Sequence, residues 1–170
     1  MRLRPPRPGS LLVATPLLTD PNFARSVVLI LQHDEDGSLG VVLDRPTAIP
    51  VGDFLPAWEE VVVEPGVVFH GGPVEPDVGI GLCIRFGSLE IIDLTAAPDD
   101  GSPVRVFAGC AGWGPGQLDD ELGENAWFVL DFDPGDLLTD TPDELWSAVL
   151  RRQSSDLSIF ATYPSDPQMN

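Results

Sequence analysis

The stretch from Ser26 to Pro46, SVVLILQHDEDGSLGVVLDRP, places the strongest constraint on how this chain folds. Two apolar runs, 27–32 and 39–43, flank a polar turn that contains Asp-Gly. Glycine adopts the positive φ that a tight reversal needs, so the pattern predicts a β-hairpin. Both arms are apolar nearly throughout, which is typical of strands covered on both faces. We therefore expect the hairpin at the centre of a sheet or closed barrel.

The rest of the chain predicts more strands than helices. Further strands are expected at 10–15, 67–70, 78–86, 90–94, 104–108 and 126–132, with 78–94 forming a second hairpin around Gly87-Ser88. Strands and helices do not alternate regularly, which disfavours a doubly wound parallel fold. We predict an α+β fold: a strongly bent mixed β-sheet that forms a pseudo-barrel, flanked by a few short helices.

Three helices are expected in all, and two of them are predicted from apolar spacing and capping residues. Apolar residues at 51, 54, 55 and 58 fall on one helical face, and Pro56 limits that helix to a short piece. Thr141-Pro142-Asp143-Glu144 has the pattern of a capping box with proline at the first helical position. The helix that it begins has an apolar face formed by Leu145, Trp146, Val149 and Leu150.

The length of 170 residues predicts one domain. Residues 1–8 are rich in Arg and Pro and are expected to form a disordered tail. The domain is expected to span residues 9–163, and residues 164–170 are expected to fray.

The charge of the chain excludes several classes of function. There are 27 acidic residues against nine basic ones, all of them arginine, which gives a net charge of −18. Such a chain is repelled by nucleic-acid phosphates and by anionic membranes, so we expect neither as a partner. Without lysine there is no Walker A loop, Schiff base or lysine general base. No apolar stretch approaches the ~20 residues of a membrane span. We expect a cytoplasmic protein.

The residues most often used in metal and redox sites are few. Cys83 and Cys110 lie in apolar surroundings and are expected to be buried free thiols, with a metal or redox pair as the alternative. His33 and His70 each end a predicted strand, where hydrogen-bonded turn residues are commoner than metal ligands. The acidic turn at 34–37 departs from the spacing of a calcium loop. We predict no metal site and no cofactor.

The glycine-rich segment 109–117, GCAGWGPGQ, is the best candidate for a binding site. Glycines before a helix expose backbone N–H groups to a ligand, and Trp113 offers a ring for stacking. The acidic residues at 119–121 oppose a phosphate. The structural alternative is a tight turn from a strand into a helix that begins at Pro115, with Gln117 reaching back to the Gly114 amide.

Several motifs together resemble the AlgH/YqgE family of uncharacterised bacterial proteins. They are LLVATPLLTDPNFARSVVLILQHDEDGSLGVVLDRP, FHGGPVEPDVG, AGCAGWGPGQLDDELGENAWFV and LWSAVLRR, in the order found in the family and spanning residues 9 to 152. The resemblance implies an α+β pseudo-barrel and a cytosolic protein, and it brings no established catalytic residue or cofactor. Asp44 stands where the family usually has Asn, which puts in doubt any role of a side-chain amide there.

The family is labelled as a transcriptional regulator of alginate production. This sequence gives no support for direct DNA binding, because it has no helix-turn-helix pattern and no basic recognition helix. Our leading hypothesis is a non-enzymatic regulatory or interaction protein that acts through a protein or small-molecule partner. The alternative is a small-molecule-binding protein or enzyme with a pocket at 109–117. That pocket would gather Arg45, His70, Gly112, Trp113 and Gln117.

Overall fold

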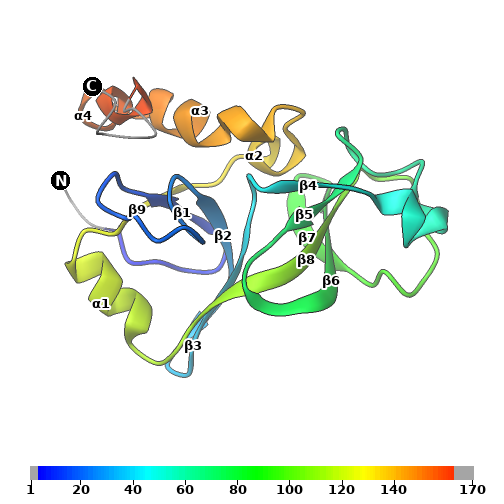
Figure 1. The fold of residues 1–170 in the computed structure, drawn as a ribbon, viewed down its shortest axis with the longest axis horizontal. Helices are drawn as coiled ribbons and strands as arrows, with labels where there is room; N and C mark the ends of the chain where they lie inside the picture. The colour runs from blue at the N-terminus through cyan, green and yellow to red at the C-terminus, as the bar shows by residue number, and fades with distance from the viewer. Residues whose placement is uncertain (1–3, 163–170) are drawn as a thin grey trace.

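The computed structural model describes residues 4–162 (Figure 1). Its strands form one sheet: β1 (Ser10–Ala14), β2 (Val27–Asp34), β3 (Gly37–Val42), β4 (Pro46–Pro50), β5 (Val67–His70), β6 (Val74–Arg85), β7 (Ser88–Ile92), β8 (Val104–Trp113) and β9 (Trp127–Asp131). Its α-helices are α1 (Gln117–Gly123), α2 (Pro134–Leu138), α3 (Leu145–Arg151) and α4 (Ser155–Ser158). Short 3₁₀ turns include η1 (Val51–Asp53), η2 (Pro56–Trp58) and η3 (Pro142–Glu144).

The sheet is mixed, and it is not closed. Strand neighbours follow the order β4-β5-β8-β3-β2-β1-β9, with β6 and β7 attached to β8 beside this path. Every pair is antiparallel except β5 with β8. In Figure 1, β1, β2, β3 and β9 form one lobe and β4 to β7 form the other. The predicted α+β class is confirmed.

Strand β8 joins the two lobes. Phe107 and Ala108 have partners in both β5 and β6, whereas residues 111–113 pair with β3. The prediction that this strand ends at residue 108 was wrong, because it continues through the glycine-rich segment to Trp113. Strand β4 was also missed. The expected helix over 51–58 is instead two separate 3₁₀ turns, consistent with the limit that Pro56 sets.

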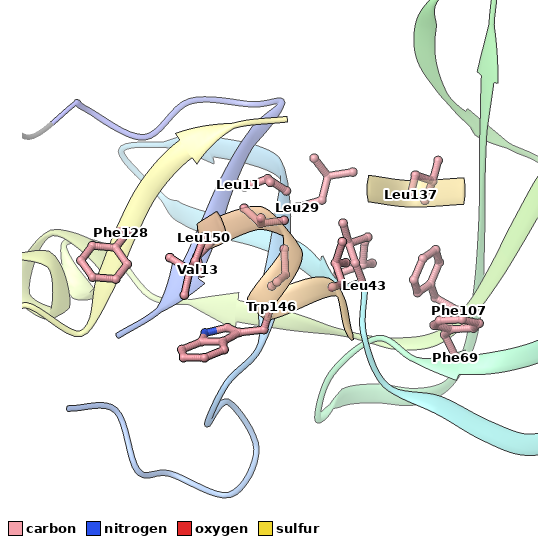
Figure 2. Packing of buried hydrophobic residues seen from close by; sticks show 14 of the residues in the cluster. Leu11, Val13, Leu29, Leu43, Phe69, Phe107, Phe128, Leu137, Trp146 and Leu150 are labelled. Carbon is pink, nitrogen blue, oxygen red and sulfur yellow. The ribbon is translucent and has the colours of Figure 1, made fainter. Parts of the chain in front are cut away.

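The part of the β2–β3 hairpin away from its turn is buried on both faces, as its sequence predicts. Val27 and Leu29 point into the larger core and Val28 and Ile30 into a second one, and all four are fully buried. The larger core runs from β1 to β8 and includes Trp146 of α3 (Figure 2). Long apolar runs without alternation therefore identified the most enclosed part of the sheet.

Two features hold the helices in place. The apolar face of α3 was predicted, and the capping box at the start of α2 was not. Helix α3 buries all four residues of its expected apolar face, and the Trp146 indole N–H donates to the Ala14 carbonyl at 2.9 Å. The capping box expected at Thr141 is not formed. One forms instead at Asp133 and Asp136, at the start of α2. Two hydrogen bonds, the shorter at 2.5 Å, join Asp136 to Arg152 after α3.

Residues at the N-terminal end of the described range contact the sheet. Within the stretch expected to be a tail, Arg4 pairs with Asp131 of β9, and the Gly9 N–H that follows donates to the Ile30 carbonyl at 2.8 Å. Residues 164–170, which were expected to fray, lie outside the described range.

Candidate functional site

Gly112 and Trp113 belong to the end of β8 and not to a loop. The Trp113 ring is buried against Phe23 and Trp127, with ring centroids 6.2 and 6.1 Å away. Its indole N–H donates to Glu121 Oε1 at 3.2 Å, and the Trp127 indole donates to the same atom at 3.1 Å. The Trp113 ring therefore stabilises the core between β8, β9 and α1 and offers no free face for stacking.

The turn after β8 matches the structural alternative for the glycine-rich segment. Gly116 has φ of 74° at the N-cap of α1, a conformation that favours glycine. The Gln117 side chain accepts from the Gly114 N–H at 3.0 Å, so the predicted reach-back is confirmed. Helix α1 begins at Gln117, two residues later than predicted, because the positive φ at Gly116 delays its first turn.

Arg45 and His70 lie together at a different place. The His70 N–H donates to the Arg45 carbonyl at 2.8 Å, and the Arg45 guanidinium donates to the Ala24 carbonyl at 2.7 Å. His70 pairs with Ala108 of β8. Ala108 lies five residues before Trp113, a separation of about 16 Å along the strand. The structure thus brings Arg45 close to His70 and Trp113 close to Gln117. None of the four side chains lines any of the four main hollows formed by the described residues.

The FHGGP motif and the first glycine of the 109–117 segment pack backbone against backbone. Gly72 has φ of 150°, and a Cβ atom there would lie 2.2 Å from the Cys110 carbonyl carbon. Gly109 has φ of 79°, and its Cβ atom would lie 2.4 Å from the Gly72 oxygen. These glycines are needed because the chain between β5 and β6 passes directly over β8.

A polar hollow of about 500 Å³, the turn hollow, lies where the β2–β3 turn meets the glycine-rich segment. It is lined by His33, Asp34, Glu35, Gly37, Ser38, Gly114, Gly116, Leu118 and Asp119. His33 Nδ1 and Ser38 Oγ are 2.6 Å apart, as cross-strand partners of the hairpin. The prediction that His33 is a hydrogen-bonded residue is confirmed. Hydrogen bonds from the Gln32 amide and the Asp36 N–H hold the pKa of Asp34 below its usual range.

An apolar hollow of about 570 Å³, the sheet groove, lies in the other lobe. Its floor is Val68 of β5 with residues 106–108 of β8, and its walls come from residues 49–55 and 76–79, with Leu94 and Thr95 at one side. The sequence analysis missed it, because five separate segments build it and none carries a local motif. The only local signal is Phe54, an aromatic residue beside an acidic one in a weak helical pattern.

Two ionisable side chains with strongly shifted pKa values lie outside both hollows. Burial raises the pKa of Asp44 to about 7, although its carboxylate accepts from the Val27 N–H at 3.2 Å and faces Arg45. Burial lowers the pKa of Arg105 to about 10. Arg105 donates to the carbonyls of Glu64, Leu137 and Thr139 and lies over the Phe69 ring at 4.4 Å. It therefore holds the loop at Glu64 and the end of α2 against β8.

The cysteines and the acidic residues of the described range form no cluster of metal ligands. Cys83 and Cys110 are buried free thiols, as predicted, and burial raises the pKa of both. High thiol pKa values make them poor nucleophiles. No three His, Cys, Asp or Glu side chains of the described range converge as metal ligands. Within the same range, no helix is long and apolar enough to cross a membrane.

The fold and its hollows define an α+β protein built on an open mixed sheet, with a polar hollow in one lobe and an apolar groove in the other. The chain belongs to the AlgH-like family, whose model matches residues 11–158.

Relatives of known sequence and structure agree with this assignment. A UPF0301 protein of Streptomyces coelicolor is 50% identical over 182 residues, which cover 95% of this chain and 94% of the relative. A crystal structure of a Corynebacterium diphtheriae protein matches with a TM-score of 0.90 at 31% identity, covering 96% of this chain and 95% of that one. The solution structure of the AlgH protein from Pseudomonas aeruginosa matches with a TM-score of 0.66 at 27% identity, covering 96% and 98%.

Proposed function

We propose that this protein is a non-enzymatic regulatory or interaction protein that acts through a protein or small-molecule partner and not by binding DNA. The observation that carries this proposal is the sheet groove, an apolar hollow within the ~300–1,000 Å³ range of binding pockets. The net charge of −18 and the absence of lysine oppose contact with phosphates. The two unbridged thiols favour a cytoplasmic location.

The proposal predicts that duplex DNA is not a ligand at physiological salt. Fluorescence anisotropy with labelled promoter fragments and random duplexes at about 150 mM salt measures this directly. We expect no binding at micromolar protein. Tight binding to either duplex would refute the proposal, because the acidic surface is the argument against nucleic acid.

A second candidate is a small-molecule-binding protein or enzyme that uses the turn hollow beside the segment 109–117. The observation that favours it is the His33–Ser38 hydrogen bond at the edge of a polar hollow lined by Gly114 and Gly116. A thermal-shift screen with metabolites, nucleotides and divalent metals tests it, because a ligand at 100 times its Kd stabilises the folded state by ~2.7 kcal/mol. A hit lost in Ser38→Ala but kept in Phe54→Ala would assign the ligand to this hollow.

A further inference from the structure

We infer that the sheet groove is the docking site for a basic, amphipathic segment of a partner protein. The inference rests on the proposed function and adds to it the place of binding and the chemistry of the partner.

Exposed apolar side chains gather at this groove. The described residues include eight exposed large hydrophobic side chains. Ile49 and Phe54, 43% and 69% exposed, line the groove, and Val78, 49% exposed, lies between the lining residues Asp77 and Gly79 of β6. Scattered surface hydrophobic residues need no explanation, but a group around one hollow marks an interaction site.

The groove has the form that an inserted segment needs. Val74 pairs with Cys110 and Gly79 with Ala108, so residues 75–78 of β6 lie opposite Gly109 alone and form a bulge. This bulge and the 49–55 segment stand on either side of the floor formed by β5 and β8. A hollow of about 570 Å³ accepts a few apolar side chains but not a folded domain. Apolar anchors at helical spacing fit such a groove.

The charge at the groove selects a cationic partner. Asp77 is the one charged residue among the twelve that line it, and no arginine is among them. Exposed Asp53 and Glu75 adjoin the lining residues Phe54 and Pro76 in the chain. A segment with Lys or Arg beside its apolar anchors would pair with these carboxylates, whereas an acidic segment or an anionic lipid surface would be repelled.

The probe is a labelled peptide of about 14 residues with Leu at helical spacing and Lys elsewhere, compared with the same peptide carrying Glu in place of Lys. Anisotropy is measured at about 150 mM salt with the full chain and with Phe54→Asp, Asp77→Lys and Phe86→Asp. Phe86 is the matched control, because it is 99% exposed at the β6–β7 turn and lies outside the groove.

We expect the Lys peptide to bind at least about tenfold more tightly than the Glu peptide. Phe54→Asp should weaken Lys-peptide binding about tenfold or more, although it adds negative charge, because it places a carboxylate among the apolar anchors. Asp77→Lys should weaken binding similarly, and Phe86→Asp should leave it unchanged. An unfolding midpoint within a few degrees of the wild-type value shows that each variant is folded.

Equal binding of the two peptides, or wild-type affinity in Phe54→Asp, would overturn the inference. Binding of the neutral dye Nile red in the groove without any peptide binding would also overturn it and would assign the groove to a small molecule. Either result leaves the proposed function standing. Tight binding to DNA refutes the proposed function whichever way the peptide experiment turns out.

Discussion

Replacing Asp44 by Asn is expected to remove a pH-dependent loss of stability between about pH 4 and pH 7. Burial raises the pKa of Asp44 from 3.8 to about 7, so the folded protein keeps a proton there that the unfolded chain loses. The folded state therefore binds more protons in this window, and its stability falls as the pH rises. Arg45 and the Val27 N–H oppose this shift and Asp143 adds to it.

The size of the effect follows from the shift. About three pKa units at ~1.4 kcal/mol each set an upper limit of ~4 kcal/mol, and relaxation around the charge reduces it. We expect Asp44→Asn to be more stable than the wild type at pH 8 by ~2–4 kcal/mol and nearly equal to it at pH 4.

Urea unfolding followed by tryptophan fluorescence at pH 4, 6 and 8 measures this difference. The other carboxylates titrate in both proteins, so the difference between the two curves isolates residue 44. Asp34→Asn is the control, because the pKa of exposed Asp34 is lowered and the variant should gain nothing at pH 8. A difference between Asp44→Asn and the wild type that is the same at all three pH values would refute the reasoning.

Three further pairs of substitutions test the packing around the candidate sites, each by urea unfolding. Gly72→Ala should destabilise by ~3 kcal/mol or more, because its Cβ meets the Cys110 backbone, whereas Gly87→Ala, with φ of 77° but open space, should lose only ~1 kcal/mol. Glu121→Ala should lose ~2–4 kcal/mol by leaving two indole donors unpaired, and Glu121→Gln, which keeps an acceptor, should lose less. Arg152→Ala should lower the free energy of unfolding by ~2 kcal/mol, because it leaves buried Asp136 without its ion-pair partner. Arg151 is exposed, and Arg151→Ala should lower it by under ~0.5 kcal/mol. Equal losses within any of these pairs would contradict the corresponding contact.

Local patterns predicted the elements in which the buried positions form one continuous run or one face. The β2–β3 hairpin and the apolar face of α3 are examples, because continuous burial or a single buried face is written directly into residue spacing. The prediction failed where tertiary contacts override local propensity. The glycines of the 109–117 segment indicated a loop, yet Gly109 lies inside β8 because the chain between β5 and β6 crosses it without room for a side chain.

The candidate sites show the same limit. Trp113 was a candidate for stacking on a ligand, but Glu121 accepts a hydrogen bond from its indole within a core that forms only when β8, β9 and α1 meet. The sheet groove has no motif, because its apolar side chains come from five segments that are separated by up to about sixty residues. Such a site becomes visible only from exposure in the folded state, where apolar side chains remain at the surface.

The arginines give a physical reason why a partner would have to supply positive charge. Arg45 and Arg105 donate to backbone carbonyls, and Arg152 is paired with Asp136. Arg85 lies among Glu90, Asp99 and Asp100. Much of the small cationic content of the chain is thus committed to holding loops and helices in place, and the carboxylates face solvent largely uncompensated. A ligand that neutralises them at an apolar groove gains from both burial and charge, which is the combination a basic amphipathic segment provides.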